Sequence, residues 1–490
     1  MYAAEQPVLP EVNLSLQPKQ GYAYLSKATE ILYGGAAGGG KSHLMRALAI
    51  SFAMNCPGIQ IYIFRRNYGD LYLNHMEGGS SFPVMLNPLV ENKLCRILSD
   101  NKIRFWNGST IHLCHLQHKK NLMKYQGAEM HILLMDELTH FLEAEYTFLR
   151  SRVRLGKWEP PEEFKEKLPF ILNGSNPGSV GHNWVKATFV DYQPHYHITR
   201  TPEEDGGMLR QYIPAKLQDN QILMRNDPGY EARLSGLGSP ELVKAMKTGD
   251  WNIVAGGALD DVWTDKVMVP NFRVPEGWRL YRTFDWGSTH PFSYGLWAVA
   301  NGEEVRLPDG SYFAPVAGSL IRVAEWYGTA KIGSNKGLKY GAKRVAEGIL
   351  SRDQDLYDND WIAKMPYTGV ADGQIFNKNE GDDDPSIADK MEEVGVYWER
   401  ANKSPGSRIN GLQLVRDRFE AVQKGEDEPG IYAMERCNAF RTTLPVLPRD
   451  PVKFDDVDTK AEDHVFDDVR YAVLNEKDTS MAGVDVRFKR

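Results

Sequence analysis

A glycine-rich segment near the N-terminus has the residue types and spacing of a phosphate-binding loop. Residues 35–42 read Gly-Ala-Ala-Gly-Gly-Gly-Lys-Ser and fit the pattern G-x-x-x-x-G-K-[ST]. Glycines let backbone N–H groups turn inward around phosphate oxygens, where larger side chains would block them. In such loops the lysine reaches the β and γ phosphates, and the hydroxyl residue binds Mg²⁺. The residues expected to contact a nucleotide are Gly35, Gly38, Gly40, Lys41 and Ser42.

The residues on either side of this segment favour nucleotide binding over a glycine-rich turn that fits the pattern by chance. The short apolar run 30–33 predicts a strand before the loop, and residues 41–54 predict a helix after it. The N-terminus of that helix would point its dipole at the bound anion. A strand before and a helix after are the context in which this pattern binds phosphate.

A second apolar run, residues 131–135, ends in two neighbouring acids, Asp136 and Glu137. A buried parallel strand that ends in carboxylates is the usual partner of a phosphate loop. Asp136 is expected to hold Mg²⁺ through water, and Glu137 to polarise the water that attacks the γ-phosphate. The alternative is a solvated acidic turn at a strand end. The phosphate loop earlier in the chain favours the catalytic interpretation.

Other polar residues of the first half are weaker candidates. Asn176 follows a predicted strand at 169–173 and is placed to sense the γ-phosphate, although Asn-Pro is also a common turn. Gln17, in the segment 16–20, is a candidate contact for the adenine edge. The arginine that stabilises the transition state is left open among Arg65, Arg66, Arg152 and Arg154.

The second half of the chain has three aspartates at or near the ends of predicted elements. Asp285 lies near the end of the first of three predicted strands, Asp372 ends a later strand, and Asp467 lies on a helix near the C-terminus. His464 precedes Asp467 by one helical turn and shares its helix face. The predicted strands are 279–287, 291–300, 320–327 and 367–372, and the predicted helices are 340–351 and 461–471.

Three strands, a crossover to a fourth strand and a late helix are the order of elements in ribonuclease H-like domains. In that arrangement Asp285, Asp372 and Asp467 would meet at one edge of the sheet. Gathered carboxylates repel one another unless cations neutralise them, and two Mg²⁺ or Mn²⁺ ions would do so and activate water against a phosphodiester. The alternative is that each aspartate is a solvated strand-end or helix-surface acid.

Together these patterns predict an α/β protein. The first part is expected to be a P-loop ATPase domain with a mostly parallel sheet and flanking helices. The second part is expected to be a ribonuclease H-like nuclease domain with a mixed sheet and helices. The predicted divisions are an ATPase domain at 1–255, a linker at 256–275, a nuclease domain at 276–478 and a basic tail at 479–490.

The linked set of motifs resembles the large subunit of a tailed-bacteriophage terminase over residues 17–474. The set is far more specific than any single motif in it. The strings that carry the resemblance are residues 35–42, 134–137, 175–178, 182–184, 219–220, 227–230, 249–251, 284–287, 463–464, 467 and 470–471.

The resemblance implies a DNA-packaging ATPase in the first domain and, in the second, a nuclease that cuts concatemeric DNA. It implies ATP and Mg²⁺ as cofactors, with Mn²⁺ as an alternative ion at the nuclease site. Asn176 matches the family's coupling position. An apparent insertion at 301–315 lengthens the stretch between Asp285 and Asp372, and Glu325 is an additional candidate metal ligand. The family's catalytic and binding roles are carried to Lys41, Ser42, Asp136, Glu137, Asp285, Asp372 and Asp467.

The partners that the resemblance implies are double-stranded DNA, the terminase small subunit and the portal protein of the procapsid. A homo-oligomeric ring is expected when the protein is docked, and the host cell cytoplasm is the expected location. Two other classes of function are open from the sequence: a host helicase-nuclease of DNA repair, and a nucleotide-switched adaptor without nuclease activity. Glu137 argues against the adaptor, and the terminase-like strings after Asn176 argue against the repair enzyme.

Composition bounds these interpretations. The 490 residues, 42% of them hydrophobic, suffice for two or three globular domains. The net charge of −7 means that DNA must be contacted by local basic groups, and Arg282, Arg408 and Arg470 are candidates. Four cysteines without C-x-x-C spacing predict reduced thiols and no zinc site. No membrane segment or export leader is expected.

Overall fold

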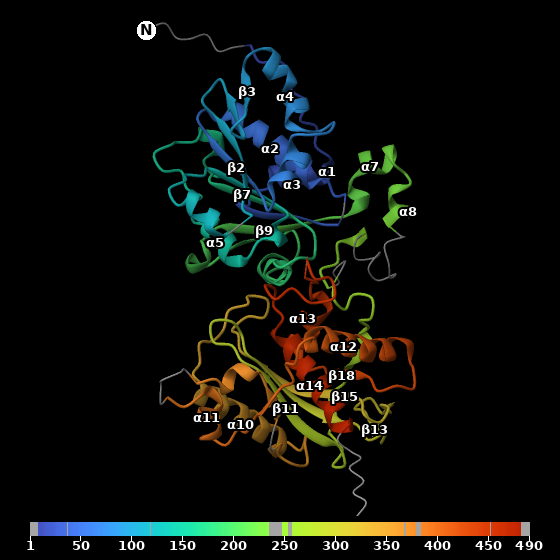
Figure 1. The fold of residues 1–490 in the computed structure, drawn as a ribbon. Coiled ribbons are helices and arrows are strands. Elements are labelled where there is room, and N and C mark those ends of the chain that lie inside the picture. The colour runs from blue at the N-terminus through green and yellow to red at the C-terminus, as the bar shows by residue number, and fades with distance from the viewer. Residues whose placement is uncertain are drawn as a thin grey trace, which may run out of the picture. The chain divides into compact units, whose positions relative to one another are not determined.

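The computed structural model of the chain describes residues 8–36, 38–117, 119–234, 247–252, 257–366, 369–378, 384–450 and 452–481. Contacts divide the chain into two units, Met1–Ala255 and Gly256–Arg490. Each unit combines a large sheet with helices (Figure 1), so the predicted α/β class is confirmed. No helix in the described ranges is long and apolar enough to cross a membrane.

Apolar runs in the first unit form the central strands of one sheet. Within the described part of the chain its nine strands have the order β3-β4-β5-β2-β6-β7-β1-β9-β8. In this order the six strands from β5 through β9 are parallel to one another. The pairs β3-β4, β4-β5 and β9-β8 at the two edges are antiparallel. The bounds are β1 Glu30–Gly35, β2 Gln60–Arg65, β3 Cys95–Leu98, β4 Lys102–Phe105, β5 Thr110–His115, β6 Ile132–Asp136, β7 Phe170–Ser175, β8 Ile198–Arg200 and β9 Leu209–Ala215.

Alternating side chains of these strands fill two cores, one on each face of the sheet. Ile31 and Leu134 pack with Leu44 of helix α2, whereas Leu32 packs in a separate core that includes Tyr146 of α5. The helices α2 and α5 therefore cover opposite faces. The helices of this unit are α1 Pro18–Leu25, α2 Lys41–Asn55, α3 Tyr68–His75, α4 Phe82–Glu91, α5 Glu143–Arg150, α6 His182–Val185, α7 Gln221–Asn226 and α8 Tyr230–Leu234.

The order of the parallel strands positions the predicted nucleotide residues. Strands β6, β7 and β1 are neighbours, and parallel neighbours end at the same edge of a sheet. The phosphate loop follows β1, the Asp136–Glu137 pair ends β6, and Asn176 follows β7. The three motifs are brought together by topology, although they are far apart in sequence.

The second unit has a mixed sheet in the order β10-β18-β15-β12-β11-β16-β17. The first three long strands, β11, β12 and β15, are antiparallel neighbours, and β16 lies parallel to β11 on its other side. This is the strand arrangement that the ribonuclease H-like order predicts. The bounds are β10 Met268–Val269, β11 Arg279–Asp285, β12 Ser293–Val299, β15 Leu320–Tyr327, β16 Gly369–Ala371, β17 Glu399–Arg400 and β18 Ile431–Met434.

Helices cover both faces of this sheet. Side chains of α12 and α14 pack in one core, and side chains of α10 and α11 pack in another. The hairpin of β13 and β14 lies within the predicted insertion at 301–315. The bounds are α10 Ala342–Asp358, α11 Ile387–Glu392, α12 Ser407–Lys424, α13 Asn438–Thr443, α14 His464–Met481, β13 Val305–Arg306 and β14 Tyr312–Phe313.

The stretch 256–275 differs from the free linker that the sequence predicts. From Ala258 onward its apolar side chains, including Leu259 and Val267, are buried in the second unit, and β10 pairs with β18. Glycines and prolines punctuate this stretch, but the apolar residues between them supply core. The predicted basic tail lies outside the described residues from position 482 onward.

Candidate functional site

The phosphate loop has the backbone that its glycines permit. Gly38 and Gly40 have φ angles of 72° and 77°, in the left-handed region that side chains disfavour. A Cβ atom at Gly40 would also lie 2.5 Å from Nε2 of Gln20, which donates a hydrogen bond to the Gly40 carbonyl. Helix α2 begins at Lys41, directly after the loop. The loop therefore delivers a helix N-terminus to the site, as anion binding requires.

Lys41 and Asn176 are in direct contact. The Lys41 ammonium donates a 2.5 Å hydrogen bond to the Asn176 side-chain oxygen, and Lys41 is largely buried. The lysine predicted to hold phosphate thus lies against the asparagine predicted to sense it.

Two residues that the sequence analysis did not single out connect Asn176 with the acidic pair. The Thr139 backbone N–H donates to Ser175 Oγ at 3.1 Å, and the Thr139 hydroxyl donates to the Asn176 carbonyl at 3.1 Å. Thr139 belongs to the short 3₁₀ turn Leu138–His140, which begins directly after Glu137. The position of Glu137 is therefore tied to that of Asn176. The sequence signal that could have identified them is a hydroxyl residue at the end of one apolar strand, Ser175, and another shortly after the end of a second, Thr139.

Asp136 is a fully buried carboxylate with one oxygen satisfied. Its Oδ2 atom lies 3.1 Å from both Arg65 Nη1 and His75 Nε2, while Oδ1 has no hydrogen-bond partner among the described residues. Burial raises the pKa of Asp136, but the hydrogen bond from His75 and the nearby charges of Arg65 and Lys41 outweigh it, so the pKa is lowered. An ionised carboxylate with a free oxygen beside the lysine fits the predicted Mg²⁺ ligand.

Glu137 has an unusual backbone for a residue with a side chain. Its φ and ψ angles are 56° and 63°, in the left-handed region. Such a conformation costs about 1 kcal/mol or more and is found most often at functional sites. The hydrogen bonds of Thr139 hold the turn that follows it, which is how the strain is sustained.

Of the four candidate arginines, Arg65 is the one that the structure brings to a predicted site residue, through Asp136. Arg66 pairs with Glu145, and Arg152 donates to the carbonyl of Gln126. The choice of a transition-state arginine stays open.

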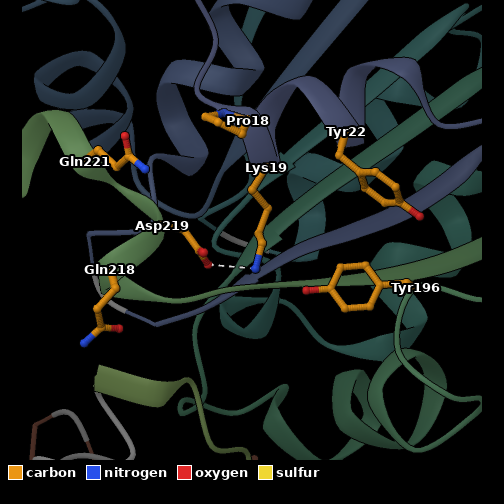
Figure 2. Close-up of a pocket in the computed structure, with 7 residues that line it drawn as sticks. All are labelled: Pro18, Lys19, Tyr22, Tyr196, Gln218, Asp219 and Gln221. Carbon is orange, nitrogen blue, oxygen red and sulfur yellow. Dashed lines mark ion pairs between the residues drawn. The ribbon is translucent and has the colours of Figure 1, made fainter.

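The predicted adenine contact lies beside a pocket of about 330 Å³. Figure 2 shows Lys19 paired with Asp219 across this pocket, with Tyr22 and Tyr196 beyond them. The pocket is lined by Pro18, Lys19, Tyr22, Tyr196, Gln218, Asp219 and Gln221.

Gln17 directly precedes this lining and is connected to the phosphate loop. Its Nε2 donates to Asn220 Oδ1 at 2.6 Å, and Asn220 Nδ2 donates to the Gly38 carbonyl at 2.6 Å. The side chain of Asn220 therefore joins the candidate base contact to the phosphate loop.

In the second unit the structure gathers the predicted acids. Asp285 ends β11, and the Asp372 N–H donates to the carbonyl of Phe284, so the two acids follow neighbouring strands. His464, at the start of α14, places Nδ1 3.2 Å from Asp285 Oδ2. Burial raises the pKa of Asp285, and repulsion from Asp467 and Asp372 adds to the rise. Asp467 and Asp372 therefore both lie within electrostatic reach of Asp285.

Basic side chains already neutralise part of this acidic cluster. Lys403 lies 2.5 Å from Asp372, and Arg408 and Arg470 each lie 3.2 Å from Asp467. Across the described ranges, no group of three or more His, Cys, Asp or Glu side chains is arranged to hold a metal ion. The donor chemistry suits Mg²⁺ or Mn²⁺, but the side chains as placed do not form a three-ligand set. The metal site stays a prediction.

The structure corrects three assignments around this cluster. Glu325 accepts hydrogen bonds from the Ala439 and Phe440 N–H groups at the start of α13 instead of joining the aspartates. Arg282 is buried and paired with Asp353, and Arg470 is also buried, so neither is displayed to DNA. Sequence spacing gives proximity along the chain, but it does not say which way a side chain on a strand or helix points.

Asp468, which the sequence analysis did not single out, fixes α14 on the sheet. Its carboxylate is fully buried and accepts from Ser293 Oγ and Arg322 Nη2, each at 2.7 Å, and from the hydroxyl of Thr283. These three donors come from β12, β15 and β11. Because Asp467 and His464 are on the same helix, this anchor sets their distance from Asp285.

Residues 32–259 match the family described as terminase large subunit, T4likevirus-type, N-terminal. The match covers residues 32–259 and confirms the resemblance carried by the motifs of this region. No curated protein matches the chain.

Several solved structures show distant similarity. The large terminase of a thermophilic bacteriophage, solved in complex with ADP, is 16% identical with a TM-score of 0.38, over 94% of this chain and 98% of that one. The HK97 bacteriophage large terminase is 10% identical with a TM-score of 0.39, over 94% and 95%. The nuclease domain of the P22 large terminase is 13% identical with a TM-score of 0.30, over 44% of this chain and 89% of its own.

Proposed function

We propose that the chain is the ATP-driven motor and nuclease of a viral DNA-packaging machine. The first unit would hydrolyse ATP to move double-stranded DNA into a procapsid, and the second would cut concatemeric DNA with Mg²⁺ or Mn²⁺. The observation that carries the proposal is the hydrogen-bonded path from Lys41 through Asn176 and Thr139 to the turn of Glu137. This path joins the phosphate loop to the hydrolytic acid within a region of the terminase family.

In the ATPase unit, each residue has a distinct part. A Mg²⁺ ion would supply positive charge against the negative charge that develops on the phosphates. The Ser42 hydroxyl and the unpartnered Asp136 oxygen would hold it. Lys41 would bind the β and γ phosphates, and Glu137 would orient and deprotonate the attacking water. When a phosphate binds Lys41, the hydrogen bond between Lys41 and Asn176 breaks. Because Asn176 follows β7, this change transmits to β7 whether phosphate is bound.

In the nuclease unit, Asp285, Asp372 and Asp467 would hold the metal ions that activate water against a phosphodiester. Lys403 and Arg408 occupy Asp372 and Asp467 in the structure, so they would have to move aside for the ions. His464 orients the Asp285 carboxylate through its 3.2 Å contact.

One hydrolysis site cannot grip and move a duplex continuously, so we propose that subunits act in a ring. The family resemblance points to a ring docked on the portal protein, with the small subunit presenting DNA, in the cytoplasm of the host cell. The basic tail, which lies largely outside the described residues, is proposed to contact the portal.

The test measures ATP hydrolysis and plasmid cutting by the full chain. Lys41→Ala should weaken nucleotide binding, and Glu137→Ala should keep binding but slow hydrolysis roughly 10²-fold, the scale of a lost general base. Asp285→Ala should abolish cutting in Mn²⁺ and leave ATP hydrolysis intact. Normal turnover by Glu137→Ala rejects the ATPase assignment. Cutting that persists in excess EDTA rejects the metal-dependent nuclease.

A further inference from the structure

The loop between β15 and α10 is bonded to both elements that carry the nuclease residues. We define residues 328–341 as the lysine loop. The N–H groups of Gly337 and Lys339 donate to the carbonyls of Thr289 and Ser288, at 2.8 and 3.2 Å, shortly after Asp285. A Cβ atom at Gly337 would lie 2.1 Å from the Ser288 carbonyl oxygen, so the loop approaches this turn more closely than other residues allow.

The same loop reaches the start of α14. Asn335 places its side-chain oxygen 3.2 Å from Nε2 of His464, whose other ring nitrogen contacts Asp285. The Gly333 N–H donates to Glu462 at 3.2 Å. The lysine loop is therefore in contact with the edge of the acidic cluster.

The loop backbone is strained where it meets the site. Asn335 and Lys339 both have side chains yet adopt φ angles of 50° and 56°. Left-handed conformations at residues with side chains are strained and persist only where surrounding contacts fix them. A simple connection between a strand and a helix needs neither the strain nor the bonds to Ser288 and His464.

The charge of the loop is opposite to that of the chain. Lys331, Lys336 and Lys339 are exposed, and Lys343 and Arg344 follow at the start of α10. Between positions 326 and 346 there are these five basic residues and no acidic one, in a chain of net charge −7. Arg282 and Arg470 are buried, so the exposed lysines of this loop are additional candidate contacts for DNA beside the acidic cluster.

We propose that the lysine loop binds the phosphate backbone of double-stranded DNA and holds it against the acids of the second unit. The inference rests on the proposed nuclease function. It adds the residues that receive the substrate: Lys336 and Lys339 contact phosphates, and Asn335 keeps the loop in register with His464. Contacts of this kind position a duplex without reading its sequence.

The test measures binding of a short duplex to the full chain as a function of salt, in the Asp285→Asn background so that no cutting occurs. Each lost phosphate contact lowers the slope of log K against log salt by about 0.9. In the double variant Lys336→Gln/Lys339→Gln the slope should fall by up to about twice this amount. The variant should bind the duplex roughly tenfold or more weakly near 0.1 M salt. The matched control is Lys266→Gln/Lys424→Gln, two exposed lysines elsewhere in the second unit, which should keep the wild-type slope.

Cutting assays separate this inference from the proposed function. With Asp285 restored, the loop variant should raise the KM for DNA while largely retaining kcat, whereas Asn335→Ala should lower kcat. If the wild-type chain cuts no DNA in Mn²⁺, the nuclease function itself fails. If it cuts, but the loop variant keeps the slope and affinity of the control, DNA binding by the loop is wrong and an acidic protein partner becomes the better explanation.

Discussion

The Thr139 side chain connects two parts of the proposed ATPase site. Its hydrogen bonds to Ser175 and to the carbonyl of Asn176 connect the turn after Glu137 with the residue that contacts Lys41. Thr139 and Ser175 are both buried, so water does not replace the bond between them when it is removed. The placement of Glu137 relative to the phosphate loop therefore depends on this side chain as well as on Lys41 and Asn176.

The first prediction follows from that path. Thr139→Val keeps the shape of the side chain and removes the hydroxyl, so ATP should still bind while hydrolysis falls about tenfold, part of the loss expected for a misplaced general base. Single-turnover hydrolysis and nucleotide binding measured in parallel check it. Thr147→Val, on the exposed side of α5, is the control and should behave as wild type. Equal hydrolysis by the two variants would show that the path has no part in catalysis.

A second prediction concerns the partners of Asp136. His75 is fully buried and contacts the carboxylate at 3.1 Å. His75→Ala removes one of its two donors, which should destabilise the first unit by about 1–3 kcal/mol and raise the Mg²⁺ concentration needed for half-maximal hydrolysis. Thermal unfolding and Mg²⁺ titration of ATPase activity measure the two effects. His43→Ala, on the partly exposed start of α2, is the control. An unchanged Mg²⁺ requirement would leave His75 with a structural part alone.

At this scale the sequence predicted positions that follow from a motif and missed contacts that arise from packing. The loop pattern names Lys41, and the strand end names Asp136, because motif and position suffice. Nothing in the sequence pairs His75 with Asp136, since the contact arises only when α3 folds over β2 and β6. The prediction that Arg282 contacts DNA was wrong for the same reason, because its pairing with Asp353 of α10 depends on which face of β11 it occupies.

At the scale of elements, apolar strands were predictable and β9 was not. The strand β9 contains Arg210 and Gln211, both buried, so its pattern does not read as a central strand. Arg210 is stabilised by a 2.7 Å contact with Glu30 on the neighbouring strand β1. Such a pair is recognisable only after the two strands are adjacent. The parallel motif strands, by contrast, are continuous apolar runs that need no partner to be identified.

Asp468 gives a third prediction, at the level of one helix. Breaking a buried ion pair leaves the partner charge uncompensated and typically costs about 3–5 kcal/mol. Asp468→Ala should therefore lower the unfolding temperature of the second unit and slow DNA cutting, because Asp467 and His464 lose their register against Asp285. Asp417→Ala, on α12, is the control. The double variant Asp468→Leu/Arg322→Met removes both charges; recovered stability without recovered cutting would separate the register effect from folding.

A fourth prediction uses the pH dependence of α6. His182 accepts from the Gly178 N–H at 2.9 Å and contacts the Trp251 carbonyl at 3.0 Å. Burial lowers its pKa to about 3, below the ordinary value of 6.5. A depressed histidine pKa means that the folded state holds the neutral ring. The contribution of the neutral ring to the free energy of unfolding is complete above pH 6.5. It is lost as the pH falls below 6.5, by roughly 1.4 kcal/mol per pH unit.

Unfolding of the first unit should therefore become easier between pH 6.5 and 5 in the wild type, and less so in His182→Gln. Calorimetry of the full chain at several pH values measures the difference. His197→Gln, at an exposed position, should follow the wild type. Parallel pH profiles for wild type and His182→Gln would mean that another group controls acid unfolding.

For the whole molecule, the packing of residues 257–270 decides where the two proposed activities can be separated. Glycine and proline content predicted a linker there, but Leu259, Val262 and Val267 are buried in the same core as side chains of α12 and α14. Glycine and proline content indicates how easily a chain turns, whereas the burial of a segment depends on which surfaces pack against it. A nuclease fragment must therefore include this stretch.

The last prediction compares two fragments. Residues 256–490 should fold and cut DNA in Mn²⁺ without ATP, because the division falls at Gly256 and the acids, α14 and their anchor lie inside. A fragment beginning at Asn271 loses several buried apolar side chains, each worth about 1.5–3 kcal/mol. Their sum is comparable to the roughly 5–15 kcal/mol that stabilises a typical domain. The shorter fragment should unfold at lower temperature and cut poorly, as circular dichroism and plasmid digestion would show. Equal stability of the two fragments would mean that residues 256–270 add nothing to the core. Failure of the longer one to cut unless the first unit is supplied would mean that the nuclease depends on the motor.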